Sequence, residues 1–201
     1  MIDLPKSCLV DKFIPKKTFY EKVGISSSVK DDFVNQIERI TWLYKLSPDT
    51  IGLSKTKNIE EIEIFQIDLK DKIIPKNIIK AITKGIPYKI LFVLKYKDDV
   101  CYSIKVEDIY TTEWNKNIEL DFNVINLELL YENIVKIIID EKDNNRNFEE
   151  IIEEKNIILD LEKRISNLKL KIKNEKQFNR KVELNKELNE ILNELEEVKN
   201  G

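Results

Sequence analysis

Apolar and polar positions alternate in several stretches of the chain, and this period of two predicts strands. The clearest stretches are residues 39–47 and 60–70, followed by a hairpin over 88–107 with its turn at residues 98–99. A short strand is also expected near 118–122, and 50–53 is a candidate for another. In the first strand the expected apolar face consists of Ile40, Trp42, Tyr44 and Leu46, and the expected polar face consists of Arg39, Thr41, Lys45 and Ser47.

Apolar residues spaced three and four apart predict helices around these strands. The first helix follows Pro15 and ends at Gly24, and the second begins near Ser26. A third helix opens at Pro75, and Asn126 caps a fourth. Together these elements predict an α+β or α/β domain in which helices flank a mixed sheet of about five strands.

The pattern changes near the end of the chain. Residues 1–140 form the predicted globular domain, the polar run 141–147 reads as a linker, and residues 148–201 form an arm. No glycine or proline interrupts the arm between residues 148 and 199, so we expect it to be helical, either as one long helix or as a helical hairpin.

Two apolar seams run along the arm with the alternating spacing that is typical of coiled-coil contacts. The first seam is Leu161, Ile165, Leu168 and Ile172, and the second is Leu184, Leu188, Ile191, Leu195 and Val198. On one continuous helix the two seams would lie about 130° apart. The arm therefore either turns back as a hairpin around residues 175–181 or stays straight and faces two different surfaces.

Charge along the arm bears on this choice. Residues 149–162 and 183–197 each hold six acidic residues and one lysine, whereas 163–181 hold eight basic residues and one acid, Glu175. A hairpin would lay one acidic end against the other. Because of this repulsion, we expect the arm to dock on a partner, or on the chain's own domain, rather than to pair with itself. The repulsion is modest and screened by salt, so it does not exclude a hairpin.

Two further stripes on the arm are candidate binding residues. A stripe with an apolar end and an amide-bearing end is the predicted partner-binding set: Phe178, Val182, Asn185 and Asn189. A basic stripe is a candidate phosphate-binding set: Lys169, Lys173, Lys176 and Arg180. The basic stripe is equally well explained as the solvated flank of a seam.

Composition narrows the class of protein. A chain of 201 residues suffices for one domain and an appendage, and its net charge of −3 gives no overall attraction to nucleic acid or anionic membrane. The longest apolar runs are too short to span a membrane, and the first residues do not resemble a signal peptide. Two distant cysteines suit a reducing compartment, so a cytoplasmic location is expected.

The chain contains no histidine, which excludes Ser-His-Asp and Cys-His catalytic arrangements. Its four glycines leave little room for a glycine-rich phosphate loop, so no nucleotide cofactor is expected. Any hydrolytic chemistry would have to depend on carboxylates, lysine and a bound metal ion.

One set of residues fits that chemistry, namely Glu38, Asp49, Asp68 and Lys70. Their order among the predicted elements resembles the core of the PD-(D/E)XK nucleases. That resemblance implies that Asp49 and Asp68 hold Mg²⁺ while Lys70 helps to activate water. However, an acidic residue followed two positions later by lysine occurs four times in this chain, which is the level expected by chance.

Five segments of the chain carry a second resemblance. They are LPKS at 4–7, KFIPKKTFYEKVGI at 12–25, IERITWLYKLSPDTI at 37–51, IPYKILFVLKY at 86–96 and EKQFNRKVELN at 175–185. They resemble the bacterial domain-of-unknown-function family 4391 over nearly the whole chain. Members of that family tend to be encoded beside DNA methyltransferases and helicases of restriction-type defence loci, and the family supplies no catalytic residues to carry over.

The expected function is therefore that of a non-enzymatic accessory subunit that docks on a larger partner through residues 148–201. The family resemblance implies a partner in a restriction-modification or phage-defence system, such as a DNA methyltransferase or helicase. The alternative is a Mg²⁺-dependent nuclease centred on Asp49 and Asp68.

Overall fold

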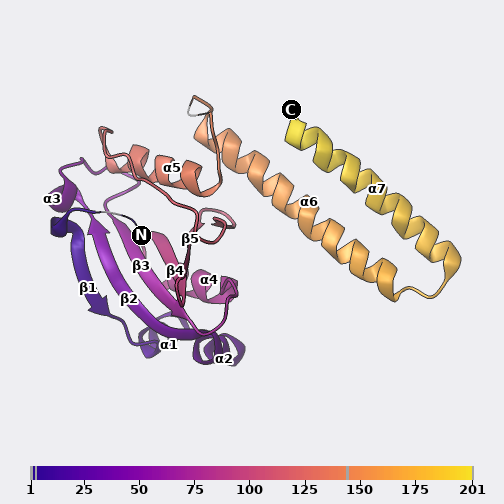
Figure 1. The fold of residues 1–201 in the computed structure, drawn as a ribbon, viewed down its shortest axis with the longest axis horizontal. Coiled ribbons are helices and arrows are strands. Elements are labelled where there is room, and N and C mark those ends of the chain that lie inside the picture. Colours follow the sequence, from indigo (N-terminus) through magenta and orange to yellow (C-terminus); the bar gives the residue numbers. More distant parts are fainter. Residues whose placement is uncertain (1, 3, 144, 201) are drawn as a thin grey trace. The chain divides into compact units, whose positions relative to one another are not determined.

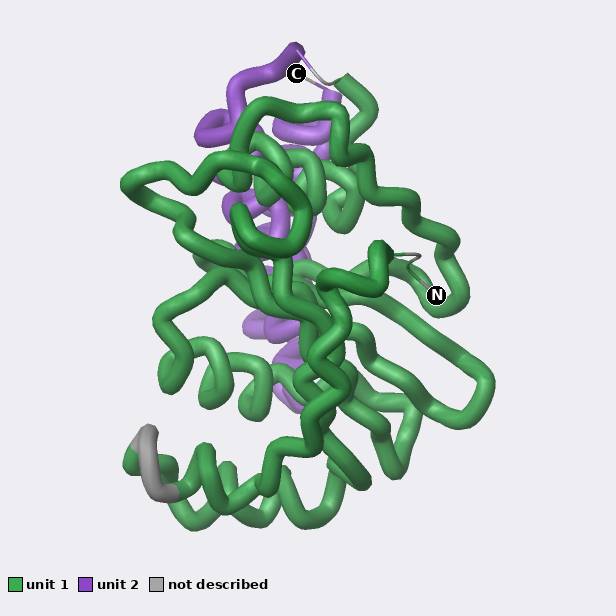
Figure 2. Tube along the Cα trace, turned by 90° about the vertical axis from the view of Figure 1, so that its left-hand side faces the viewer, with its two compact units in different colours: residues 1–144 green, residues 145–201 purple. Residues whose placement is uncertain are grey.

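The computed structural model describes residues 2, 4–143 and 145–200, apart from the side chains of residues 21–23. The chain divides into two compact units, residues 1–144 and residues 145–201 (Figure 2). The division falls inside the polar run 141–147. None of the described helices combines the length and the hydrophobicity needed to cross a membrane.

A mixed sheet forms the centre of the first unit (Figure 1). In the described residues it has six strands in chain order: β1 (Leu9–Phe13), β2 (Ile37–Leu46), β3 (Ile62–Leu69), β4 (Lys89–Tyr96), β5 (Asp99–Lys105) and β6 (Ile109–Thr111). Neighbouring strands are antiparallel except β3 and β4, which are parallel. The helix between β3 and β4 supplies the crossover that a parallel pair requires. The predicted α+β class is confirmed.

Short helices complete this unit. They are the 3-10 helix η1 (Lys6–Cys8) and the α-helices α1 (Lys17–Val23), α2 (Ser27–Gln36), α3 (Pro48–Ile51), α4 (Lys76–Gly85) and α5 (Leu127–Ile138). Their ends follow the sequence signals. Gly24 ends α1 with a φ of 59°, a left-handed conformation that glycine adopts without strain. The side chain of Asn126 caps α5 by accepting a hydrogen bond from the Leu129 N–H at 2.9 Å.

One face of the sheet packs against α1, α2 and α4. Fully buried side chains from these layers include Phe33 of α2, Ile79 of α4 and Phe92 of β4. Trp42 and Phe65 lie opposite each other on β2 and β3, and their rings stack with centroids 6.4 Å apart. Burial of each such side chain contributes roughly 1.5–3 kcal/mol, so this layer fixes how β2, β3 and β4 align.

Helix α5 covers the opposite face. Lys89 precedes Ile90 on β4, so the two side chains point to opposite faces of the sheet. Ile90 belongs to the core under α4, whereas the Lys89 ammonium lies 5.1 Å from the ring centroid of Tyr131 on α5. Both faces of the central strands are therefore buried, which explains the nearly continuous apolar sequence of β4.

The predicted faces of β2 are only partly correct. The β2–β3 register shifts between Trp42 and Tyr44, because β2 contains an irregularity there. Past this shift Lys45 lies opposite Glu63, on the face that carries Trp42 and Phe65, and Tyr44 and Leu46 turn to the other face. A period-two pattern cannot reveal such an extra residue in a strand.

Three short segments also differ from the predictions. Residues 50–53 contain the end of α3 and no strand, since Thr50 and Ser47 hydrogen-bond to each other and start a helical turn. Residues 118–122 form no strand, and the sixth strand of the sheet is β6, which ends earlier, at Thr111. The edge strand β1 was not predicted, because its mostly exposed side chains show no clear alternation.

The second unit is a helical hairpin of α6 (Phe148–Asn174) and α7 (Phe178–Asn200). The two predicted seams pack against each other, with Leu161, Leu184 and Ile191 buried between the helices. The charge-based preference against self-pairing is therefore wrong. The acidic side chains lie outside the seams and stay in water, where salt screens the repulsion between them. Near the end of α7, the Lys199 ammonium also pairs with the Glu162 carboxylate at 3.0 Å. The free energy gained by burying the apolar seams therefore outweighs this repulsion.

Candidate functional site

The four residues of the predicted nuclease centre lie at two different ends of the β2–β3 pair. Arg39 lies opposite Asp68, which places Glu38, Asp68 and Lys70 near one end. Asp49 is exposed on α3, beyond the other end of the pair, where Leu46 lies opposite Ile62. The strand from Ile62 to Asp68 alone covers roughly 20 Å. The structure therefore does not bring Asp49 and Asp68 together, and they cannot share a metal ion.

Asp68 and Lys70 have structural partners. The Asp68 carboxylate accepts a hydrogen bond from the Gln66 amide at 2.8 Å. The Lys70 ammonium donates to the carbonyl of Val34 at 2.7 Å and so ties the end of β3 to α2. In the described part of the chain, no cluster of three or more acidic or cysteine side chains is arranged to hold a metal ion.

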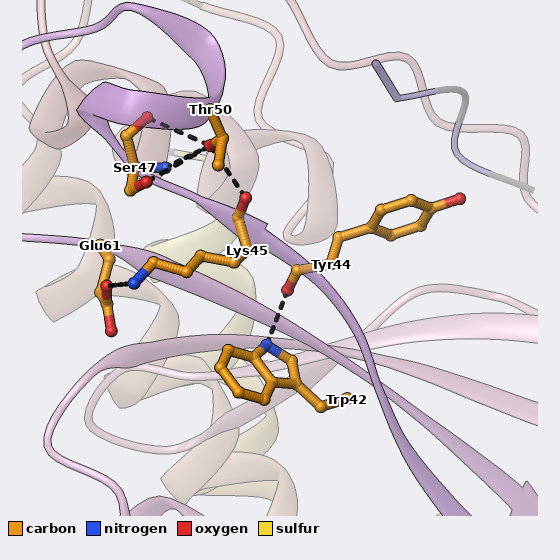
Figure 3. A network of polar contacts seen from close by, with 6 residues as sticks. All are labelled: Trp42, Tyr44, Lys45, Ser47, Thr50 and Glu61. Carbon is orange, nitrogen blue, oxygen red and sulfur yellow. Dashed lines mark hydrogen bonds and ion pairs between the residues drawn. The ribbon is translucent and has the colours of Figure 1, made fainter. Parts of the chain in front are cut away.

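A different polar cluster lies at the start of β3, beside the shifted end of β2 (Figure 3). The Lys45 ammonium forms an ion pair with the Glu61 carboxylate. The main chain of this end of β2 is fixed by Thr50, whose hydroxyl accepts from the Ser47 N–H at 2.8 Å and donates to the Lys45 carbonyl at 3.0 Å. The Trp42 indole N–H donates to the Tyr44 carbonyl at 3.1 Å across the register shift.

Glu63 is the buried member of this cluster, with 3% of its surface exposed. Its Oε2 atom receives no hydrogen bond from a donor among the described residues. Burial raises the pKa of Glu63 to about 8, and the neighbouring Glu61 carboxyl adds to the shift, while the positive charge of Lys45 opposes it. The Glu63 carboxyl is therefore protonated at neutral pH.

The cluster of Lys45, Glu61 and Glu63 was not predicted. Glu61 and Glu63 are visible in the sequence as alternate residues of one strand, so their common face was predictable. Lys45 was assigned to the wrong face because of the register shift. A protonated carboxyl beside an ion pair is capable of proton exchange near neutral pH. However, Glu63 does not line the surface groove at the start of β4. We therefore interpret the cluster as structural.

A single carboxylate side chain holds the turn between α6 and α7. Glu175 closes it by accepting hydrogen bonds from the backbone N–H groups of Lys176 at 2.7 Å and Gln177 at 2.8 Å. These backbone hydrogen bonds lower the pKa of Glu175, so the turn is held by a carboxylate at neutral pH. The seam does not reach the turn, because Leu184 is the first buried residue of α7.

Apolar side chains close to this turn stay exposed. Phe178 is 78% exposed, Leu170 is 57% exposed and Val182 is 53% exposed. Leu170 lines a shallow surface groove of about 460 Å³ with Lys171 and Arg180. Phe178 and Val182 lie one turn apart on the same side of α7, and we call this pair the tip patch. Exposed apolar side chains that cluster beside basic ones are typical of a protein-binding surface.

The other predicted binding residues of the arm are also exposed on the hairpin. The Asn185 amide donates to the Lys181 carbonyl at 2.7 Å, so it is committed to its own helix. Arg180 forms an ion pair with Glu183 at 2.7 Å, whereas Lys169, Lys173 and Lys176 are solvated. All four residues of the predicted partner-binding set are therefore exposed, and one N–H of the Asn185 amide is used within its own helix.

Comparisons with known proteins give one match. No curated protein and no solved structure matches the chain at a significant level. One family, described as "Domain of unknown function (DUF4391)", matches residues 2–195, which cover the sheet, its helices and nearly the whole hairpin. The chain therefore belongs to the DUF4391 family.

Proposed function

We propose that the protein is an accessory subunit that docks on a larger protein partner through the tip patch of its helical hairpin. The observation that carries this proposal is the exposure of Phe178, the first residue of α7, in a hairpin whose other large apolar side chains mostly form a buried seam. An aromatic side chain that is left in water costs free energy which a partner's pocket would recover.

The charges around the tip patch indicate the chemistry of the partner's surface. Lys176 and Lys181 are exposed and lie within three residues of Phe178 in the sequence, whereas the Glu175 carboxylate already accepts two backbone hydrogen bonds in the turn. A complementary surface would have an apolar pocket with an acidic rim, which would speed association and exclude basic partners. The family resemblance further suggests a DNA methyltransferase or helicase of a bacterial restriction-modification or phage-defence system as the partner.

Affinity purification of the full chain from its own host, followed by quantitative mass spectrometry, tests this function. Phe178→Ala and Val182→Asp should each lower the recovery of the partner at least tenfold, because the first removes an aromatic side chain worth about 2 kcal/mol or more at a hot spot. The second places an unpaired charge in an apolar contact. Deletion of residues 148–201 should abolish recovery and leave the first unit folded.

Val34→Asp is the matched control, since Val34 is also 53% exposed and also lies on a helix, but in the first unit. A protein that is retained by Val34→Asp and lost with Val182→Asp supports the proposal. Equal recovery from both variants, or a partner that survives deletion of the hairpin, contradicts it.

A further inference from the structure

A groove of about 620 Å³ opens on the first unit, where α4 ends and β4 begins. The last turns of α4, the segment before β4 and the end of β5 contribute its walls. Its polar side chains include Lys80, Thr83, Lys84, Tyr88, Lys89 and Lys105. Four of the residues that line the groove are lysines and none is acidic, although the chain as a whole has a net charge of −3.

Three of these lysines have no ion-pair partner among the residues that the structure describes. Lys80, Lys84 and Lys105 form no ion pair with a described residue, and the Lys105 ammonium donates only to the carbonyl of Val106, at 3.4 Å. Lys89 differs, because its ammonium lies over the Tyr131 ring. The groove therefore concentrates positive charge, which favours an anionic ligand.

The fold holds these cations in place. Lys80 and Lys84 are one turn apart on α4, a helix anchored by the fully buried Ile78, Ile79 and Ile82. Lys105 is the last residue of β5, the strand that pairs with β4 in the sheet. Three ammonium groups carried by two elements, α4 and β5, around one groove suit a ligand with several anionic groups.

Two features of the groove indicate the class of that ligand. Tyr88 lines the groove and is 38% exposed, so part of its side chain is accessible to an unpaired base. Lysines act as point charges that contact phosphates without reading sequence. A duplex presents no unpaired base to the Tyr88 ring. We infer that this groove binds single-stranded nucleic acid, with Lys80, Lys84 and Lys105 contacting its phosphates and Tyr88 stacking on a base.

This binding site is separate from the tip patch, since every residue that lines it belongs to the first unit. Its failure would leave the proposed partner docking unaffected, and the reverse also holds.

Fluorescence anisotropy of the full chain with a labelled oligothymidylate of about 20 nucleotides tests the inference. Three phosphate contacts predict a slope near −2 when the logarithm of the binding constant is plotted against that of the salt concentration. Lys80→Gln/Lys84→Gln should weaken binding at least tenfold at low salt and bring the slope to about −0.7. Tyr88→Ala should weaken binding without changing the slope, and Tyr88→Phe should restore it, because stacking needs only the ring.

The matched control is Lys95→Gln/Lys97→Gln, which removes the same charge at the turn end of the β4–β5 hairpin, away from the groove. This control should bind like the unsubstituted protein. The inference is overturned if both double variants bind alike or if the unsubstituted chain shows no binding. It is also overturned if a duplex, or a mononucleotide at equal phosphate concentration, competes as well as the single strand does.

Discussion

Glu63 is buried in the sheet with a carboxyl group that the folded protein keeps protonated. The same group in an unfolded chain ionises with the ordinary pKa of 4.5, whereas burial raises the pKa to about 8 in the fold. Between these two values the folded state binds the additional proton. The free energy of unfolding must therefore fall as the pH rises through this window, at up to about 1.4 kcal/mol for each pH unit.

Glu63→Gln removes this dependence, because the amide of glutamine does not ionise. We expect the free energy of unfolding of the Glu63→Gln variant to change by at least about 2 kcal/mol less between pH 5 and pH 8 than that of the unsubstituted chain. Urea denaturation at a series of pH values, followed by tryptophan fluorescence, measures it. Lys45 and Glu61 remain in both proteins, so the difference isolates Glu63.

Glu60→Gln removes the same charge from an exposed neighbour and serves as the control. It should leave the pH profile unchanged. If Glu63→Gln also keeps the profile of the unsubstituted chain, Glu63 does not hold a proton in the folded state.

At the scale of elements, the sequence predicted most of the architecture and little of what depends on register. Helix ends at Gly24 and Asn126 were predictable, because a left-handed glycine and a capping side chain act within a few residues. Every residue of the two predicted seams packs between α6 and α7, and Leu192 joins them without having been predicted. The packing of the two seams against each other was not predicted, because the weak repulsion between acidic segments was given more weight than the burial of apolar side chains.

The candidate sites show the same limit. The exposure of Phe178 and Val182 was predictable, because both lie at helical spacing outside the seams. Lys80 and Lys84 were visible as a pair on one helix. Their association with Lys105 depends on the crossover from β3 to β4, which brings residues distant in sequence to one groove. The pairing of Lys45 with Glu61 depends on a register shift that no periodic pattern encodes.

The cap of α5 gives an element-scale prediction. Asn126→Ala removes the side-chain oxygen that accepts from the Leu129 N–H, so the free energy of unfolding of the first unit should fall by about 1 kcal/mol. Asn126→Asp keeps an acceptor at the same position and should stay within a few tenths of a kcal/mol. Urea midpoints of the two variants measure the difference, and equal midpoints would show that the cap contributes nothing.

At the scale of the whole molecule, each unit has apolar side chains buried among its own elements. Ile79 lies in the layer between α4 and the sheet, whereas Leu184 lies between the two helices of the hairpin. Both tryptophans, Trp42 and Trp114, belong to the first unit. Tryptophan fluorescence therefore reports on the first unit alone, while far-UV circular dichroism also reports on the long helices of the second.

This arrangement predicts that the units respond separately to core substitutions. Leu184→Ala should cost about 2–5 kcal/mol within the hairpin, so the far-UV signal should be lost at lower temperature while the fluorescence midpoint stays the same. Ile79→Ala should lower the fluorescence midpoint by several degrees and leave a later far-UV phase from the hairpin. Thermal unfolding of both variants, monitored with both signals, measures this. A fluorescence midpoint that moves with Leu184→Ala would mean instead that the hairpin and the sheet unfold as one cooperative body, and removal of the hairpin would then destabilise the first unit as well.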